Sequence, residues 1–175
     1  MILNSDLILY HPFWEKADNE LVGKDGVLFN RLVDVYVLAC AIGVKEDKTV
    51  VEIEITLSTP KSIVRNTYMR PTNTDLNNLL SFMLQNILLN SKTIDLDLDE
   101  RLKLAFDPDY NANKLRAGEL LNGFANYGIE QVFSRIDSVS PLVVVEELHS
   151  YFDEKSDTMI DEILKSITLE ELKDW

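Results

Sequence analysis

The densest run of apolar residues in the chain extends from Val27 to Val44. The positions within it that fall at helical spacing of three and four residues are Phe29, Leu32, Val33, Tyr36, Ala39 and Gly43. Asn30, Arg31 and Asp34 place polar groups only near its start. This pattern predicts a helix that is buried on nearly all sides, with Gly43 placed to end it.

Helical patterns also cover most of the remaining chain. His11-Pro12 indicates a helix start, because proline in the first turn lacks only an N–H that would be unpaired in any case. Thr72-Asn73-Thr74 can cap a helix over about 75–89. Its apolar face comprises Leu76, Leu79, Leu80, Met83, Ile87 and Leu88. Further helices are predicted over about 97–106, 111–136, 140–153 and 157–175.

Three glycines recur every five residues within the segment 111–136, at Gly118, Gly123 and Gly128. A spacing of five rotates around a helix, so the three cannot share one face. Each costs about 1 kcal/mol of helix propensity relative to alanine. We therefore expect either that a neighbouring element packs closely at one or two of them or that the helix breaks there.

One segment has the period of a strand rather than a helix. Apolar and polar residues alternate from Val51 to Leu57, which predicts a small β element near 49–57 with one wet face. Its partner would be the N-terminal segment or another subunit, since a lone strand leaves both edges unpaired. The sequence thus predicts a mainly α fold: a single compact domain over 1–175 with about six to seven helices and this β element.

The charge of the chain is unevenly distributed. The 175 residues carry a formal net charge of −13. Residues 1–90 contain 8 basic and 11 acidic side chains, whereas residues 91–175 contain 9 and 19. An acidic surface repels phosphate backbones, so any nucleic-acid contact would have to be local. A single cysteine excludes an internal disulfide. The sequence also contains no apolar segment long enough to span a membrane, so we expect a cytoplasmic protein.

The acid-free window 55–74 is the local exception. It contains Lys61, Arg65 and Arg70 together with Tyr68. On a helical turn Lys61 and Arg65 would share a face, and such a patch could grip phosphate with Tyr68 available for stacking. The competing interpretation is that these cations pair with acidic groups of the protein's own C-terminal half.

Other candidate chemistry is weaker. The run Asp95-x-Asp97-x-Asp99-Glu100 starts like a calcium loop but lacks its later glycine and glutamate, and an acidic helix start explains it. Glu146 and His149 could donate two metal ligands, although solvated surface is the simpler interpretation. Cys40 lies in the most apolar segment, where a thiol is usually a core residue. No catalytic motif is present, and we expect no cofactor and no bound metal.

Two segments carry a family resemblance. The first reads Phe29-x-x-x-x-Asp34-Val35-Tyr36-Val37-x-Ala39-x-Ala41-Ile42-Gly43, and the second reads Ala125-Asn126-x-Gly128-Ile129-Glu130. Both are similar to segments of small proteins that accompany bacterial DNA phosphorothioation (Dnd-type) and related anti-phage operons. The resemblance implies a compact, largely helical accessory protein that acts beside larger defence enzymes. It supplies no catalytic residues.

These observations favour a non-catalytic accessory or adaptor protein of a bacterial defence or DNA-modification system. Its partner would be a larger protein of the same operon, and a homo-oligomer is also compatible with the sequence. The alternative is a nucleic-acid or phosphate-ligand binding protein that uses Lys61, Arg65, Tyr68 and Arg70. A nuclease built from distant carboxylates that converge on a metal is a third hypothesis.

Overall fold

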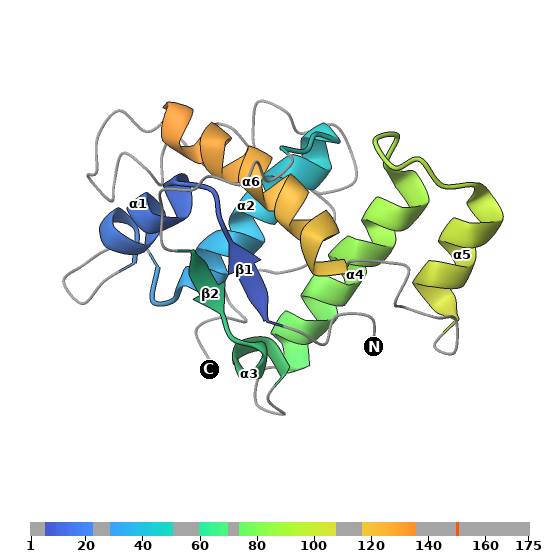
Figure 1. The fold of residues 1–175 in the computed structure, drawn as a ribbon, viewed down its shortest axis with the longest axis horizontal. Helices are drawn as coiled ribbons and strands as arrows, with labels where there is room; N and C mark the ends of the chain where they lie inside the picture. Colours follow the sequence, from blue (N-terminus) through green and yellow to red (C-terminus); the bar gives the residue numbers. More distant parts are fainter. Residues whose placement is uncertain are drawn as a thin grey trace. The chain divides into compact units, whose positions relative to one another are not determined.

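The computed structural model describes residues 6–22, 29–50, 60–69, 74–107, 117–135 and 150. The chain divides into two compact units, 1–137 and 138–175. The elements of the first unit, in chain order, are β1 (Leu7–Leu9), α1 (Phe13–Glu20), α2 (Leu32–Glu46), β2 (Lys61–Ile63), α3 (Arg65–Met69), α4 (Thr74–Asn90), α5 (Leu98–Phe106) and α6 (Ala117–Arg135) (Figure 1). The predicted mainly α fold is confirmed, whereas the extent of a single domain over 1–175 stays a prediction.

The pair formed by α2 and α6 is the centre of this unit, and the two helices cross closely in Figure 1. None of the α2 residues is exposed, which confirms the prediction of a helix buried nearly all round. Two glycines permit the close approach. A Cβ at Gly128 of α6 would lie 1.8 Å from the carbonyl oxygen of Ala39, and one at Gly43 would lie 2.1 Å from that of Phe124. Backbone therefore touches backbone at two points along the pair.

Gly43 does not end α2, and this prediction was wrong. The helix continues to Glu46, and Asp47 adopts the left-handed conformation at φ 50° and ψ 48°. The N–H of Asp47 donates to the carbonyl oxygens of Gly43 and Val44, as expected at a helix C-terminus. Phe29, which the helical spacing included, lies before the helix: it forms an isolated bridge with Val22, and the first helical residue is Leu32.

The glycine pattern of α6 follows the first of the two expected alternatives. The helix is continuous from Ala117 to Arg135, and a neighbour packs closely at Gly128. Gly118 and Gly123 are not crowded, since an added Cβ would meet Leu7 at 3.4 Å and Thr49 at 3.5 Å, respectively. The predicted residues 111–116 lie outside the described part of the chain.

A two-stranded antiparallel sheet completes the core. β1 pairs with β2 in the register Leu7↔Ile63, Ile8↔Ser62 and Leu9↔Lys61. Leu7, Leu9 and Ile63 are buried, and the side-chain amide of Asn122 on α6 donates to the carbonyl oxygen of Ile8 at 2.8 Å. The N-terminal segment does pair with a strand, but that strand lies at 61–63. The predicted strand residues 51–57 lie outside the described residues.

α4 and α5 form an antiparallel pair beside this core. Gln85 donates to the carbonyl oxygen of Ala105 at 3.1 Å, and Arg101 donates to that of Leu88 at 3.5 Å. The side chains of α4 that face the core are Leu80, Leu84, Ile87 and Leu88. Both helices confirm the predicted segments 75–89 and 97–106. Leu79, however, was placed on the apolar inner face and is 41% exposed.

The remaining predicted helices, over 140–153 and 157–175, lie outside the described residues apart from position 150. Among the helices that the structure describes, none combines the length and apolarity that a membrane crossing requires.

Candidate functional site

The basic window does not form the arrangement expected of it. Lys61 lies in β2 and Arg65 begins α3, so the two do not share a helical turn. The ammonium group of Lys61 is 2.7 Å from the carboxylate of Asp18 on α1. Lys61 thus has an acidic partner within the protein, although this partner belongs to the N-terminal half and not to the acidic C-terminal half. Arg70 lies outside the described residues.

Tyr68 is not available for stacking, which corrects the expectation for this residue. Its side chain is fully buried, and burial together with the nearby Asp6 carboxylate raises the pKa of its hydroxyl to about 12. The Asp6 carboxylate also accepts a hydrogen bond from the backbone N–H of Arg65 at 2.7 Å. The polar groups around α3 thus fasten this short helix to the start of β1.

Cys40 is a core thiol, as the sequence indicated. It lies on the buried helix α2, and desolvation raises the pKa of the thiol from 9.0 to about 12. A thiol held protonated in this way is a poor nucleophile.

The raised pKa values of Cys40 and Tyr68 predict a loss of stability at alkaline pH. Both groups ionise in the unfolded chain before they ionise in the folded one, so stability present below about pH 9 is lost as the pH rises toward 12. Between the pKa of a group in the unfolded chain and its pKa in the folded protein, each pH unit lowers the free energy of unfolding by about 1.4 kcal/mol per group. Urea unfolding at pH 8 and pH 11 should show a smaller pH-dependent loss for Cys40→Ala than for the wild type, by roughly 2–3 kcal/mol. An equal loss for both proteins would contradict the buried thiol.

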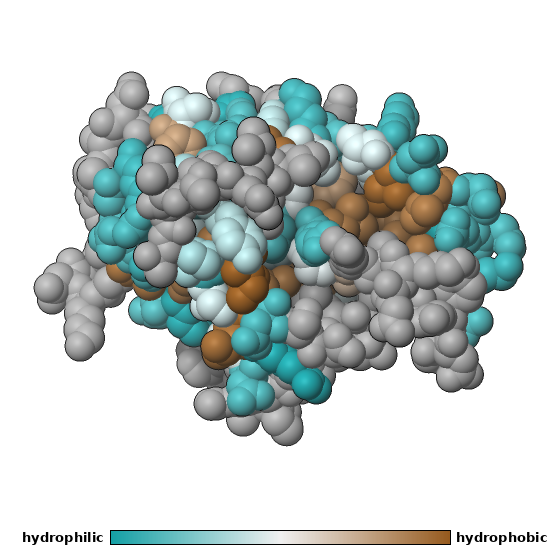
Figure 2. Space-filling model, viewed as in Figure 1, coloured by the Kyte–Doolittle hydropathy of each residue, from teal (hydrophilic) through white to brown (hydrophobic). Residues whose placement is uncertain are grey.

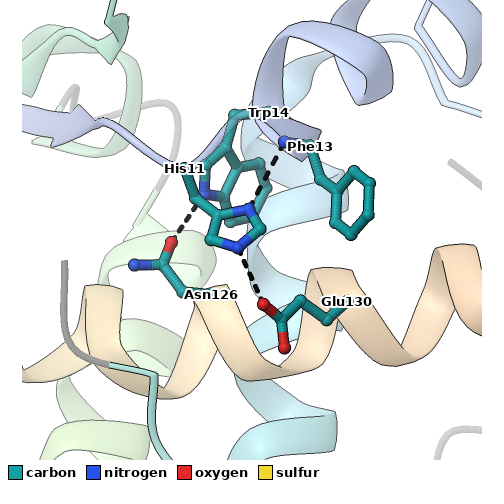
Figure 3. Close-up of polar contacts among 5 residues, drawn as sticks. All are labelled: His11, Phe13, Trp14, Asn126 and Glu130. Atoms are coloured by element: carbon teal, nitrogen blue, oxygen red, sulfur yellow. Dashed lines mark hydrogen bonds and ion pairs between the residues drawn. The ribbon is translucent and has the colours of Figure 1, made fainter. Parts of the chain in front are cut away.

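A polar cluster fastens α1 to α6, and Figure 3 shows how its side chains point toward one another. The indole N–H of Trp14 donates to Oδ1 of Asn126 at 2.8 Å, and both side chains are buried. Nδ1 of His11 accepts from the backbone N–H of Phe13 at 3.3 Å, and the other ring nitrogen, Nε2, faces Glu130. That nitrogen lies 2.9 Å from Oε1 of Glu130.

The cluster has a structural role. Both ring nitrogens of His11 make contacts within the protein, one to the start of α1 and one to α6. The buried Nδ2 of Asn126 has no hydrogen-bond partner among the described residues, and Oδ1 of the same amide holds the indole of Trp14. From the sequence, His11 is expected only as part of a helix start. Its contact with a residue 119 positions away is invisible in local sequence.

A second polar cluster surrounds the end of α2. The Asp47 carboxylate accepts hydrogen bonds from the hydroxyl of Ser91 at 2.5 Å and the backbone N–H of Lys92 at 2.9 Å. These bonds hold the turn that follows α4. A cavity of about 210 Å³ lies here, lined by Val44, Asp47, Asn86, Ile87, Asn90, Ser91, Lys92 and Phe124. It is smaller than the pockets of about 300–1,000 Å³ that hold most organic ligands.

At the same end of α2, Tyr127 of α6 donates to the Glu46 carboxylate at 2.6 Å. Desolvation and this carboxylate raise the pKa of the Tyr127 hydroxyl, and the pKa of the exposed Lys48 is raised by its contacts with Tyr127 and Glu46. These contacts bind the end of α2 to α6.

The acidic run before α5 acts as a helix start. Oδ1 of Asp97 accepts from the backbone N–H of Glu100 at 2.9 Å, which is an N-cap, and Asp99 pairs with Lys103 at 2.5 Å along the helix. Within the described ranges, no three His, Cys, Asp or Glu side chains gather closely enough to hold a metal ion. Glu146 and His149 lie outside these ranges.

The most unusual surface lies on α4 and α5. Large apolar side chains are exposed on both helices, and we call them the apolar strip: Leu79, Phe82, Leu98, Leu102 and Phe106. The exposed fractions reach 65% for Leu98, 60% for Phe106 and 54% for Phe82. Figure 2 shows hydrophobic surface in the part of the molecule where Figure 1 draws α4 and α5. Several large apolar side chains exposed on neighbouring helices are typical of interaction sites.

The sequence does contain a signal for this strip. Leu98, Leu102 and Phe106 recur every four residues, although Leu104 and Ala105 already supply the buried face of the same short helix. Two apolar faces on one helix indicate that one of them lacks a partner within the core.

The chain matches no protein-family model, no curated protein and no solved structure.

Proposed function

We propose that this protein is a non-catalytic accessory or adaptor protein that acts by binding a larger protein partner. The observation that carries the proposal is the apolar strip on α4 and α5, which exposes two phenylalanines and three leucines to solvent. Protein interfaces are enriched in aromatic side chains and depleted of charge at their centre. The described histidine, His11, contacts Glu130 and thereby joins the start of α1 to α6.

The proposed setting is a bacterial anti-phage defence or DNA-modification system. It rests on the two segments that resemble Dnd-type accessory proteins. Apart from Phe29, which precedes α2, these segments fall in α2 and α6, and they include Gly43 and Gly128, at which the two helices touch. The resemblance therefore concerns residues that build the scaffold, and it supports a shared architecture more directly than a shared partner.

Affinity capture of the tagged full-length chain from its native host tests this proposal. With the neighbouring genes expressed at natural levels and mild salt, we expect one larger protein to be recovered in near-stoichiometric amount. An unrelated protein of similar acidity and size, carrying the same tag, controls for charge-driven adsorption. Recovery of no protein beyond that control would overturn the proposal.

A further inference from the structure

We infer that the apolar strip binds an amphipathic helical segment of the partner that carries lysine or arginine beside its own apolar face. This inference rests on the proposed function and adds to it the surface used and the chemistry of the partner. Three features of the molecule support it: the geometry of α4 and α5, the distribution of charge around them and the area exposed.

The two helices expose their apolar side chains on the same side. At 100° per residue, Phe82 lies about 60° from the contact residue Gln85, on the side away from the buried Leu84. On α5, Leu102 lies about 60° from the contact residue Ala105, on the side away from the buried Leu104. In both helices the exposed residue therefore lies on the same rotational side of the contact residue when each helix is viewed along its own direction. Because the two helices run antiparallel, equal rotations place both exposed faces on the same side of the pair.

The centre of this face carries little charge. Asp75 is the only charged residue in the 17 positions of α4. An exposed helix that interacts only with water usually carries charged residues along its outer face. The outer side of α4 instead presents Leu79 and Phe82 among uncharged polar residues such as Asn78. This composition is that of an interface centre.

The border of the strip is acidic. Six acidic and three basic residues occur in 74–107, and the exposed carboxylates at the N-terminal side of α5 belong to Asp95, Asp97 and Asp99. Two of these three basic side chains already have partners within the protein. The guanidinium of Arg101 donates to the backbone carbonyls of Leu96 and Ser91, at 2.8 and 2.7 Å, and Lys103 pairs with Asp99. A partner with basic groups beside its apolar face would complement this border.

The size of the strip fits a short helix. The nine residues of α5 span about 14 Å, a length that matches about two and a half turns of a partner helix. A half-exposed phenylalanine leaves on the order of 100 Å² uncovered. The strip therefore supplies the centre of a small interface, for which micromolar affinity is typical.

The test uses a fluorescein-labelled peptide of about 18 residues, made of leucine and lysine with the leucines at helical three- and four-residue spacing. Its matched partner has glutamate in place of lysine. Fluorescence anisotropy measures both peptides against the full-length wild type, the double variant L98S/F106S and the control V64S. Val64 is 52% exposed and lies between β2 and α3, so V64S removes a comparable apolar side chain elsewhere.

We expect the lysine peptide to bind the wild type and V64S equally, and L98S/F106S at least tenfold more weakly. The glutamate peptide should bind the wild type at least tenfold more weakly than the lysine peptide. A second variant, D75K/D95K, should lose affinity for the lysine peptide even if L98S/F106S fails to fold. Absence of binding, equal binding by V64S and L98S/F106S, or equal binding of both peptides would overturn the inference.

Other occupants of the strip give different results. A second copy of the chain would give a wild-type dimer in sedimentation that L98S/F106S dissociates, and that result would overturn the inference. Failure of this inference is distinguishable from failure of the proposed function. If L98S/F106S still captures the native partner, the proposed function holds, but the partner does not bind through the apolar strip. If the wild type captures none, the proposed function fails whatever the peptides do.

Discussion

Gly128→Ala is expected to destabilise the protein by about 3 kcal/mol or more, because its Cβ would overlap the backbone of α2. The added carbon would lie 1.8 Å from the carbonyl oxygen of Ala39 and 2.5 Å from its carbonyl carbon. Backbone cannot move aside as a flexible side chain can, so the two central helices must separate. The gain in helix propensity from alanine, about 1 kcal/mol, is too small to compensate. Thermal unfolding should shift downward by roughly 6–12 °C.

Gly123→Ala is the matched control for this experiment. It lies five residues earlier in α6, and its added Cβ would meet the side chain of Thr49 at 3.5 Å and the carbonyl oxygen of Val50 at 3.9 Å, both ordinary contacts. Propensity alone should then decide the outcome, and we expect a stabilisation of up to about 1 kcal/mol. If both alanine variants change stability by the same amount and in the same direction, the close packing of α2 and α6 is wrong.

Trp14→Ala is expected to destabilise the protein by about 3–5 kcal/mol, which is usual when a large aromatic side chain is removed from a core. Trp14 of α1 is fully buried, and the centroid of its ring lies 5.7 Å from that of Tyr36 on α2. The substitution also leaves Oδ1 of Asn126 without its donor, so a buried amide loses its one described hydrogen bond. Urea unfolding followed by circular dichroism measures the loss.

Trp14→Phe separates the loss of packing from the loss of the hydrogen bond. It keeps most of the aromatic contact and removes the indole N–H, so we expect it to cost about 1–3 kcal/mol. Because alanine removes both the ring and the hydrogen bond, a loss for alanine more than twice that for phenylalanine would show that packing of the aromatic ring contributes more to stability than the hydrogen bond does. A loss below about 1 kcal/mol for Trp14→Ala would contradict the assignment of this residue to the core.

Local pattern was sufficient to predict most of the helices but not their ends. The burial of α2 follows from an apolar run in which nearly every side chain needs cover. Its end was misplaced because Gly43 has a tertiary role, the approach of the Phe124 backbone, which no local pattern encodes. Asp47 ends the helix instead, since aspartate tolerates the left-handed conformation and its carboxylate also holds the turn at Ser91.

The candidate sites show the same limit. The sequence does contain a window, 55–74, without acidic side chains. In the fold, however, Lys61 lies in a strand and pairs with Asp18, and the side chain of Tyr68 is buried in the core. Both outcomes depend on contacts between residues distant in the chain. The apolar strip was in principle readable from the four-residue spacing of Leu98, Leu102 and Phe106. Which of the two apolar faces of α5 is covered depends on the position of α4, and only the fold provides this information.

The most direct test of the central claim, binding to a larger protein, is the mass of the complex purified from cells that express this chain together with its neighbouring genes. Multi-angle light scattering on the size-exclusion peak should give a mass well above the 20.0 kDa of the chain, with one larger protein present in fixed ratio. Elution of the chain alone, at its own mass, would contradict the account.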